Sequence, residues 1–90
     1  MSFSRYLGAD SARAVINRRI FEMAEEGYQH QLNIKYTEHL LEGLNPNGDV
    51  AERDELFMQR EASRARVMVL EQAIEWHNTR LSAFDKNTSE

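Results

Sequence analysis

The chain of 90 residues has no cysteine, one proline and one tryptophan. Without cysteine, neither a disulfide framework nor a zinc site with thiolate ligands can form. No apolar run approaches the roughly 20 residues that a bilayer-spanning helix needs, and Met1–Asp10 lacks the apolar core of a signal peptide. These absences predict a cytoplasmic protein without a membrane segment, and packing alone must stabilise it.

The single proline lies mid-chain, in the segment Gly43-Leu44-Asn45-Pro46-Asn47-Gly48-Asp49. Proline presets the second position of a turn and glycine suits the fourth. Gly43 fits the left-handed residue that often ends a helix. Asp49, followed by Glu52 three residues later, resembles a capping box at the start of a second helix. The segment therefore predicts a turn over residues 43–49.

Both flanks of this turn have the apolar spacing of a helix, which predicts helices over about 10–42 and 50–84. At 1.5 Å per residue each helix is about 50 Å long. Residues 1–9 either pack back on the helices or form a short docking segment, and the polar residues 85–90 are predicted to be a disordered tail. The predicted fold is all-α, an antiparallel two-helix hairpin that we expect to dimerise into a four-helix bundle.

On a helical wheel each predicted helix shows one apolar stripe that closes the hairpin. The stripes consist of Ala12, Ile16, Ile20, Met23, Gly27, His30, Ile34 and Leu41, and of Leu56, Ser63, Val67, Leu70, Ile74, His77, Leu81 and Phe84. Counting outward from the turn places Met23 opposite Leu70 and His30 opposite Ser63. A hydrogen bond between His30 and Ser63 would set the register, as polar core residues do in some coiled coils.

Each predicted helix also has a second apolar stripe, which a hairpin alone does not need. The residues that we expect at a partner interface are Phe21, Tyr28, Leu32 and Tyr36 on the first helix, and Met58, Val69 and Trp76 on the second. Aromatic residues and methionine are enriched at interface cores. The alternative is that these are scattered surface side chains of the kind every protein has.

The sequence predicts no catalytic residue, metal site or cofactor. His30 and His77 are about 21 Å apart in the predicted register, too far to share a metal ion. His39 lies on another face, and the chain has no Glu-x-x-His pair of the type that binds two iron ions in bundles. Ser63 beside His30 lacks an oxyanion site, and no glycine-rich phosphate loop is present.

The second helix has a basic middle, formed by Arg53, Arg60, Arg64 and Arg66. Acidic residues are interleaved with these arginines, and the net charge is −4. Such mixed charge usually indicates a solvated face with local ion pairs. Nucleic-acid binding by a small dimeric regulator is therefore the second function that the sequence allows, and a membrane partner is not expected.

In outline and length the chain is similar to small helical hairpins such as type III secretion needle subunits and their chaperones, WXG-type secreted proteins and plasmid RNA-binding dimers. The turn lacks the Trp-x-Gly of the WXG type. Because architecture alone does not transfer function, the main expectation comes from the stripes. We expect a non-enzymatic interaction module that binds itself or another helical protein, as an adaptor, small chaperone, inhibitor or assembly subunit.

Overall fold

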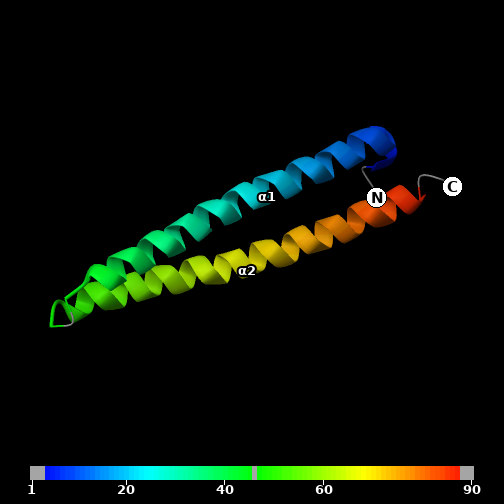
Figure 1. Cartoon of the computed structure of the whole chain (residues 1–90). Coiled ribbons are helices and arrows are strands. Elements are labelled where there is room, and N and C mark those ends of the chain that lie inside the picture. Colours follow the sequence, from blue (N-terminus) through cyan, green and yellow to red (C-terminus); the bar gives the residue numbers. More distant parts are fainter. Residues whose placement is uncertain (1–3, 46, 88–90) are drawn as a thin grey trace.

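The protein is a long antiparallel helical hairpin (Figure 1). The computed structural model describes residues 4–45 and 47–87, with the side chains of residues 7–45 and 47–83. Helix α1 (Ser4–Gly43) and helix α2 (Val50–Asn87) pack along their lengths, and both ends of the chain lie at the end of the rod away from the turn. The rod measures 66 × 21 × 17 Å. The predicted all-α hairpin is confirmed.

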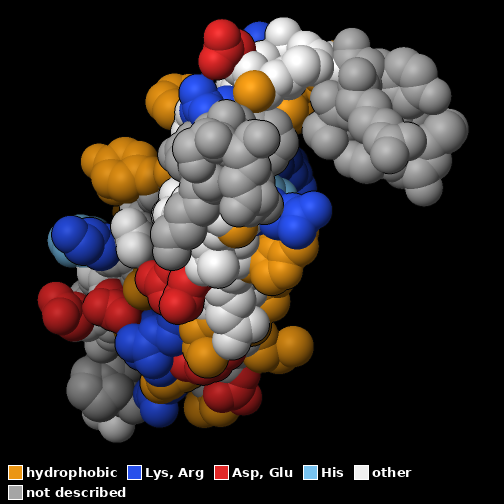
Figure 2. Space-filling view, turned by 90° about the vertical axis from the view of Figure 1, so that its right-hand side faces the viewer, with side chains coloured by type: hydrophobic (Ala, Val, Ile, Leu, Met, Phe, Trp, Pro, Cys, Tyr) orange, Lys and Arg blue, Asp and Glu red, His pale blue; other side chains and the backbone are white. Residues whose placement is uncertain are grey.

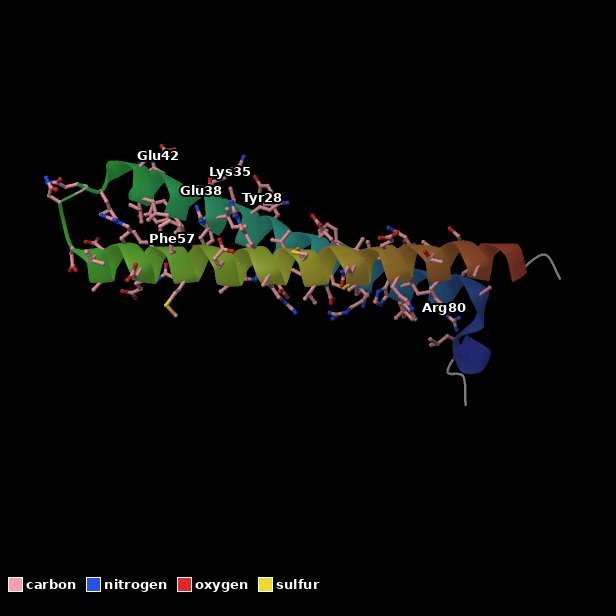
Figure 3. All side chains as sticks on the ribbon, turned by 90° about the horizontal axis from the view of Figure 1, so that it is seen from below. Tyr28, Lys35, Glu38, Glu42, Phe57 and Arg80 are labelled. Carbon is pink, nitrogen blue, oxygen red and sulfur yellow. The ribbon has the colours of Figure 1, made fainter. Side chains whose placement is uncertain are left out.

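Helix α1 is interrupted near its start by Gly8, whose φ of 77° and ψ of 167° are not helical. This backbone region is essentially restricted to glycine. The residues before Gly8 turn away from the line of α1 (Figure 3). The sequence predicted the helix from residue 10, whereas helical residues extend back to Ser4 beyond the bend. Residues 1–3 of the predicted N-terminal segment lie outside the described residues.

The turn between the helices is built around Asn45 and Gly48. The Gly48 N–H donates to the Asn45 carbonyl at 2.8 Å, and the Asn47 N–H donates to the Asn45 side-chain oxygen at 3.0 Å. A Cβ at Gly48 would lie 3.0 Å from the Asn45 carbonyl oxygen, so a residue with a side chain would be crowded against the backbone at this position. Pro46 lies outside the described residues.

The two helix ends at this turn are closed differently. The Asp49 carboxylate accepts the Ala51 N–H at 2.9 Å, which is the predicted N-cap of α2. The prediction of a left-handed Gly43 was wrong, because among the described residues only Gly8 has a positive φ. Instead, the Leu44 N–H donates to the Leu41 carbonyl at 3.3 Å and tightens the last turn of α1. Helix α2 continues to Asn87, into the segment predicted as tail, and residues 88–90 are outside the description.

The hairpin has a thin core along the predicted first stripes. All described side chains of these stripes are buried or half-buried, while that of Phe84 is not described. Among the residues whose side chains are described, the buried apolar ones are Ala12, Met23 and Leu70. The most buried of the described side chains is that of Thr37, which is 1% exposed. The sequence analysis missed Thr37 because it is polar, although it continues the core spacing between Ile34 and Leu41.

One polar contact across the hairpin differs from the predicted register by about one helical turn, whereas the pair of Glu26 and Arg66 agrees with that register. Asn33 Nδ2 donates to Ser63 Oγ at 2.8 Å, so the predicted hydrogen bond between His30 and Ser63 was wrong. His30 instead lies 3.5 Å from Glu26 of its own helix. Counting from the turn ignores that each Cα–Cβ bond tilts toward the N-terminus of its helix. In an antiparallel pair this tilt brings an α1 side chain against an α2 residue further from the turn.

Candidate interaction surfaces

All seven residues that the sequence placed at a partner interface are exposed in the hairpin. Their exposed fractions run from 49% for Leu32 to 73% for Met58. Further large apolar side chains are exposed as well, including Val15, Phe57 and Met68. Figure 2, which looks along the rod from the end away from the turn, shows hydrophobic side chains on both flanks. Many of the large apolar side chains of this protein therefore lie on its surface and not in its core.

The seven residues belong to two groups, which we name after their helices. The α1 group comprises Phe21, Tyr28, Leu32 and Tyr36, and the α2 group comprises Met58, Val69 and Trp76. Three residues along a helix return to the same side, whereas two residues lead to the opposite side. Val69 is three residues from Arg66, which crosses the helix–helix seam to bind Glu26, and Glu26 is two residues from Tyr28. Tyr28 and the α2 group therefore lie on opposite sides of the hairpin.

Four shallow hollows lie along the side of Tyr28. Counted from the turn, each hollow shares lining residues with the next. The first and second share Glu38, the second and third share Tyr28 and Gln31, and the third and fourth share Glu71 and Ile74. We call this feature the furrow. It extends from Glu42 and Phe57 near the turn, past Gly27 and Leu70, to Asn78 and Ser82.

Two regular rows of side chains form the rims of the furrow. On α1 the row is Phe21, Ala24, Tyr28, Gln31, Lys35, Glu38 and Glu42, and on α2 it is Phe57, Glu61, Arg64, Met68, Glu71, Glu75, Asn78 and Ser82. Successive members are three or four residues apart, so each row stays beside the core seam as in a coiled coil. In Figure 3, Tyr28, Lys35, Glu38 and Glu42 follow one another along α1, with Phe57 across from them on α2.

The sequence analysis missed the α2 row because most of its members are charged or polar. Phe57 and Met68 share its spacing with Glu71 and Glu75, and this spacing of three and four was the available signal. Arg60 partly covers Phe57, with its guanidinium carbon 4.6 Å from the ring centre. This is a cation–π contact, in which the positive charge of Arg60 is attracted to the electron-rich face of the Phe57 ring.

The middle of the furrow is an apolar hollow of about 270 Å³, lined by Met23, Gly27, Val67, Leu70 and Ile74 among others. Gly27 opens it, because a helical residue with a side chain would fill part of this space. A Cβ at Gly27 would lie 3.8 Å from Leu70 Cδ1, which is ordinary van der Waals contact.

Ion pairs cross the seam on both sides of the hairpin. Arg64 lies 3.2 Å from Glu38 on the furrow side, and Arg66 makes a bidentate pair with Glu26 on the other side. The hydrogen bonds to Arg66 lower the pKa of the Glu26 carboxyl, and the neighbouring charges of Arg66 and His30 add to this. The same pair raises the pKa of Arg66.

Most of the predicted basic middle of α2 is engaged by acidic side chains. Arg60 lies 3.3 Å from Glu61, and Arg64 also contacts Glu61 at 3.5 Å. Together with the Arg66 pair, these contacts make the surface one of mixed charge.

His77 and Ser63 have structural contacts. His77 Nδ1 donates to the Ala73 carbonyl at 2.6 Å, and its ring packs edge-on against Trp76 with centroids 5.0 Å apart. Ser63 is bonded to Asn33 and not to a histidine. Within residues 4–45 and 47–87, no three acidic or histidine side chains are grouped to hold a metal ion, and neither helix is long and apolar enough to cross a membrane.

No protein-family model matches this chain, and no curated protein or solved structure is significantly similar to it.

Proposed function

We propose that the protein is a non-enzymatic module that assembles by helix packing, either with its own copies or with another helical protein. The observation that carries this proposal is an imbalance within the described part of the chain, where three apolar residues are buried and many large apolar side chains are exposed. Large exposed apolar patches commonly mark interaction sites.

The surface area supports the same proposal. The chain of 10.5 kDa exposes 7132 Å², whereas a compact monomer of this mass exposes about 5,400 Å². The excess of about 1,700 Å² is more than the roughly 800 Å² that each partner buries in a standard interface. A partner would therefore cover surface that a compact protein of this size covers by itself.

The two apolar groups suggest how the module works. Because Tyr28 and the α2 group lie on opposite sides, one hairpin can hold two neighbours at once. This property suits an adaptor or an assembly subunit, and a small chaperone or inhibitor would use one of the two sides. We also propose that the protein is located in the cytoplasm and catalyses no reaction.

Trp76 is the residue on which the α2 group should depend most. It is 61% exposed and is the largest side chain of that group. Trp76→Ala is expected to weaken the association made by this group by more than about 2 kcal/mol, because tryptophan is a frequent hot spot. The measurement is light scattering over a dilution series, with Glu25→Gln, at an exposed position of α1 outside the α2 group, as the control.

Two results would count against the proposal. If the wild-type chain stays monomeric at every concentration and binds no helical partner, the module does not assemble. If Tyr28→Ala and Trp76→Ala both leave association unchanged, neither group is an interface. Circular dichroism must show that both variants keep the helical content of the wild type.

Nucleic-acid binding remains a second proposal, and the structure offers little in its favour. The arginines at 60, 64 and 66 are paired with carboxylates, and these pairs would have to break before the arginines could bind phosphates. Such binding would weaken steeply with salt. A lack of RNA or DNA binding at low ionic strength would exclude it.

A further inference from the structure

We propose that the furrow is the surface through which two copies of this chain meet, packed antiparallel about a two-fold axis near Gly27 and Leu70. This inference rests on the proposed function and specifies which side of the hairpin the second copy covers. In such a dimer the half of the furrow near the turn of one copy faces the half away from the turn of the other copy.

The charges along the furrow favour this antiparallel arrangement. The turn half carries the basic residues Lys35, Arg60 and Arg64 and three carboxylates, those of Glu38, Glu42 and the rim residue Glu61. The other half is lined by Glu71 and Glu75, and no basic residue lines it. An antiparallel two-fold brings the acidic half of each copy against the half that holds Arg60 and Arg64, whereas a parallel one would bring the two acidic halves together. Complementary potentials favour the first arrangement.

The spacing along α2 allows a specific contact between the copies. Glu75 lies five residues beyond Leu70 and Arg64 lies six residues before it, which is about 7.5 Å and about 9 Å along the helix. When α2 packs antiparallel against its copy, these two side chains come to nearly the same level. Half of the Arg64 side chain is still exposed, although it also contacts Glu38 and Glu61.

The central hollow gives the contact an apolar core. It is open at Gly27, and the exposed side chain of Tyr28 lines it. The exposed Met68 follows the lining residue Val67 on α2. A two-fold axis close to Gly27 places Tyr28 of one copy opposite the hollow of the other. The area required is available, because a standard interface takes about 800 Å² from each copy. The α2 group stays outside this contact, on the other side of the rod.

Spin-label distances test the proposal directly, because the chain has no cysteine of its own. Ala24→Cys puts a label on the furrow, and Ala62→Cys puts a matched label on the side of Arg66. Asn47→Cys puts a label at the turn. In the proposed dimer the Ala24 labels lie within about 20 Å of each other, and the turn labels lie about 60 Å apart. The Ala62 labels are well separated, on opposite outer faces.

Charge reversal provides the second arm of the test. Glu75→Lys places a lysine near Arg64 of the copy, so the dimer dissociation constant should rise about tenfold at low ionic strength. Glu25→Lys changes the net charge equally on the outer face of α1 and should leave that constant within about twofold.

The outcomes separate this inference from the proposed function. Close Ala62 labels with distant Ala24 labels would show that the copies meet through the other side, which overturns the furrow and leaves the module intact. Close turn labels would overturn the antiparallel arrangement. A chain that stays monomeric at every concentration would also overturn the furrow dimer, and the proposed function would then depend on a heterologous helix.

Discussion

Three glycines of this chain stand where they do for different physical reasons. Gly8 adopts a backbone conformation that other residues avoid, with open space around it. Gly48 lies so close to the Asn45 carbonyl that a side chain would push against the backbone. Gly27 has neither constraint, since its φ is helical and a Cβ there meets only Leu70 at contact distance. What Gly27 provides is the hollow of the furrow.

Replacing Gly27 should therefore stabilise the isolated hairpin. Alanine costs less backbone entropy than glycine in a helix, so Gly27→Ala is expected to raise the free energy of unfolding by about 0.5–1 kcal/mol. Urea denaturation at a concentration where the chain is monomeric measures this change. Gly48→Ala is the contrasting variant and should lower stability. A Gly27→Ala chain that is less stable than the wild type would show that the helices pack more closely there.

At the scale of the helices, α2 has the better defined start. The Asp49 side chain holds the Ala51 N–H, and the Arg53 N–H follows with a bond to the Asp49 carbonyl at 3.3 Å. An N-cap satisfies a backbone donor that no helical carbonyl can reach. Helix α1 has no comparable single start, because the bend at Gly8 divides its first residues from the rest.

Asp49→Ala is expected to lower the stability of the hairpin by about 1 kcal/mol, within the range measured for lost N-caps. Asp49→Ser keeps a side-chain oxygen at this position and should restore most of the loss. Thermal unfolding followed by circular dichroism compares the two variants. Equal melting temperatures for the alanine and serine variants would show that the cap contributes nothing.

At the scale of the whole molecule, contacts between the helices are few and partly polar. The hydrogen bond from Asn33 to Ser63 and the pairs of Arg64 with Glu38 and of Arg66 with Glu26 cross the seam. Polar contacts of this kind help to specify register, which a thin apolar core does not do strongly. Stability of the hairpin should therefore respond to acid.

The pair of Glu26 and Arg66 predicts the direction of that response. A carboxyl whose pKa is lowered in the folded state contributes stability above its ordinary pKa of about 4.3, and this contribution is lost as the pH falls through the lowered value. Glu26→Gln should be less stable than the wild type at pH 7, and the two should converge in acid. Urea denaturation between neutral and acidic pH tests this. Glu25→Gln, at an exposed position next in the chain, is the control and should follow the wild type.

Local spacing and turn chemistry determined much of the fold from the sequence alone. The break around Asn45 and Gly48, the cap at Asp49 and the first stripes predicted a helical hairpin, and the contacts of these residues agree. These features depend on residues that are close together along the chain. The bend at Gly8 was also local, but glycine alone does not reveal which φ it adopts.

The tertiary structure alone decided which side chains face each other across the hairpin. Asn33 reaches Ser63 because side chains tilt along both helices, and Tyr28 and the α2 group diverge because each helix is rotated to bury its own core row. A helical wheel describes one helix at a time, so it shows exposed stripes but not how the stripes of two helices combine. The central hollow of the furrow is lined by residues of both helices, so packing the two helices together was needed to reveal it.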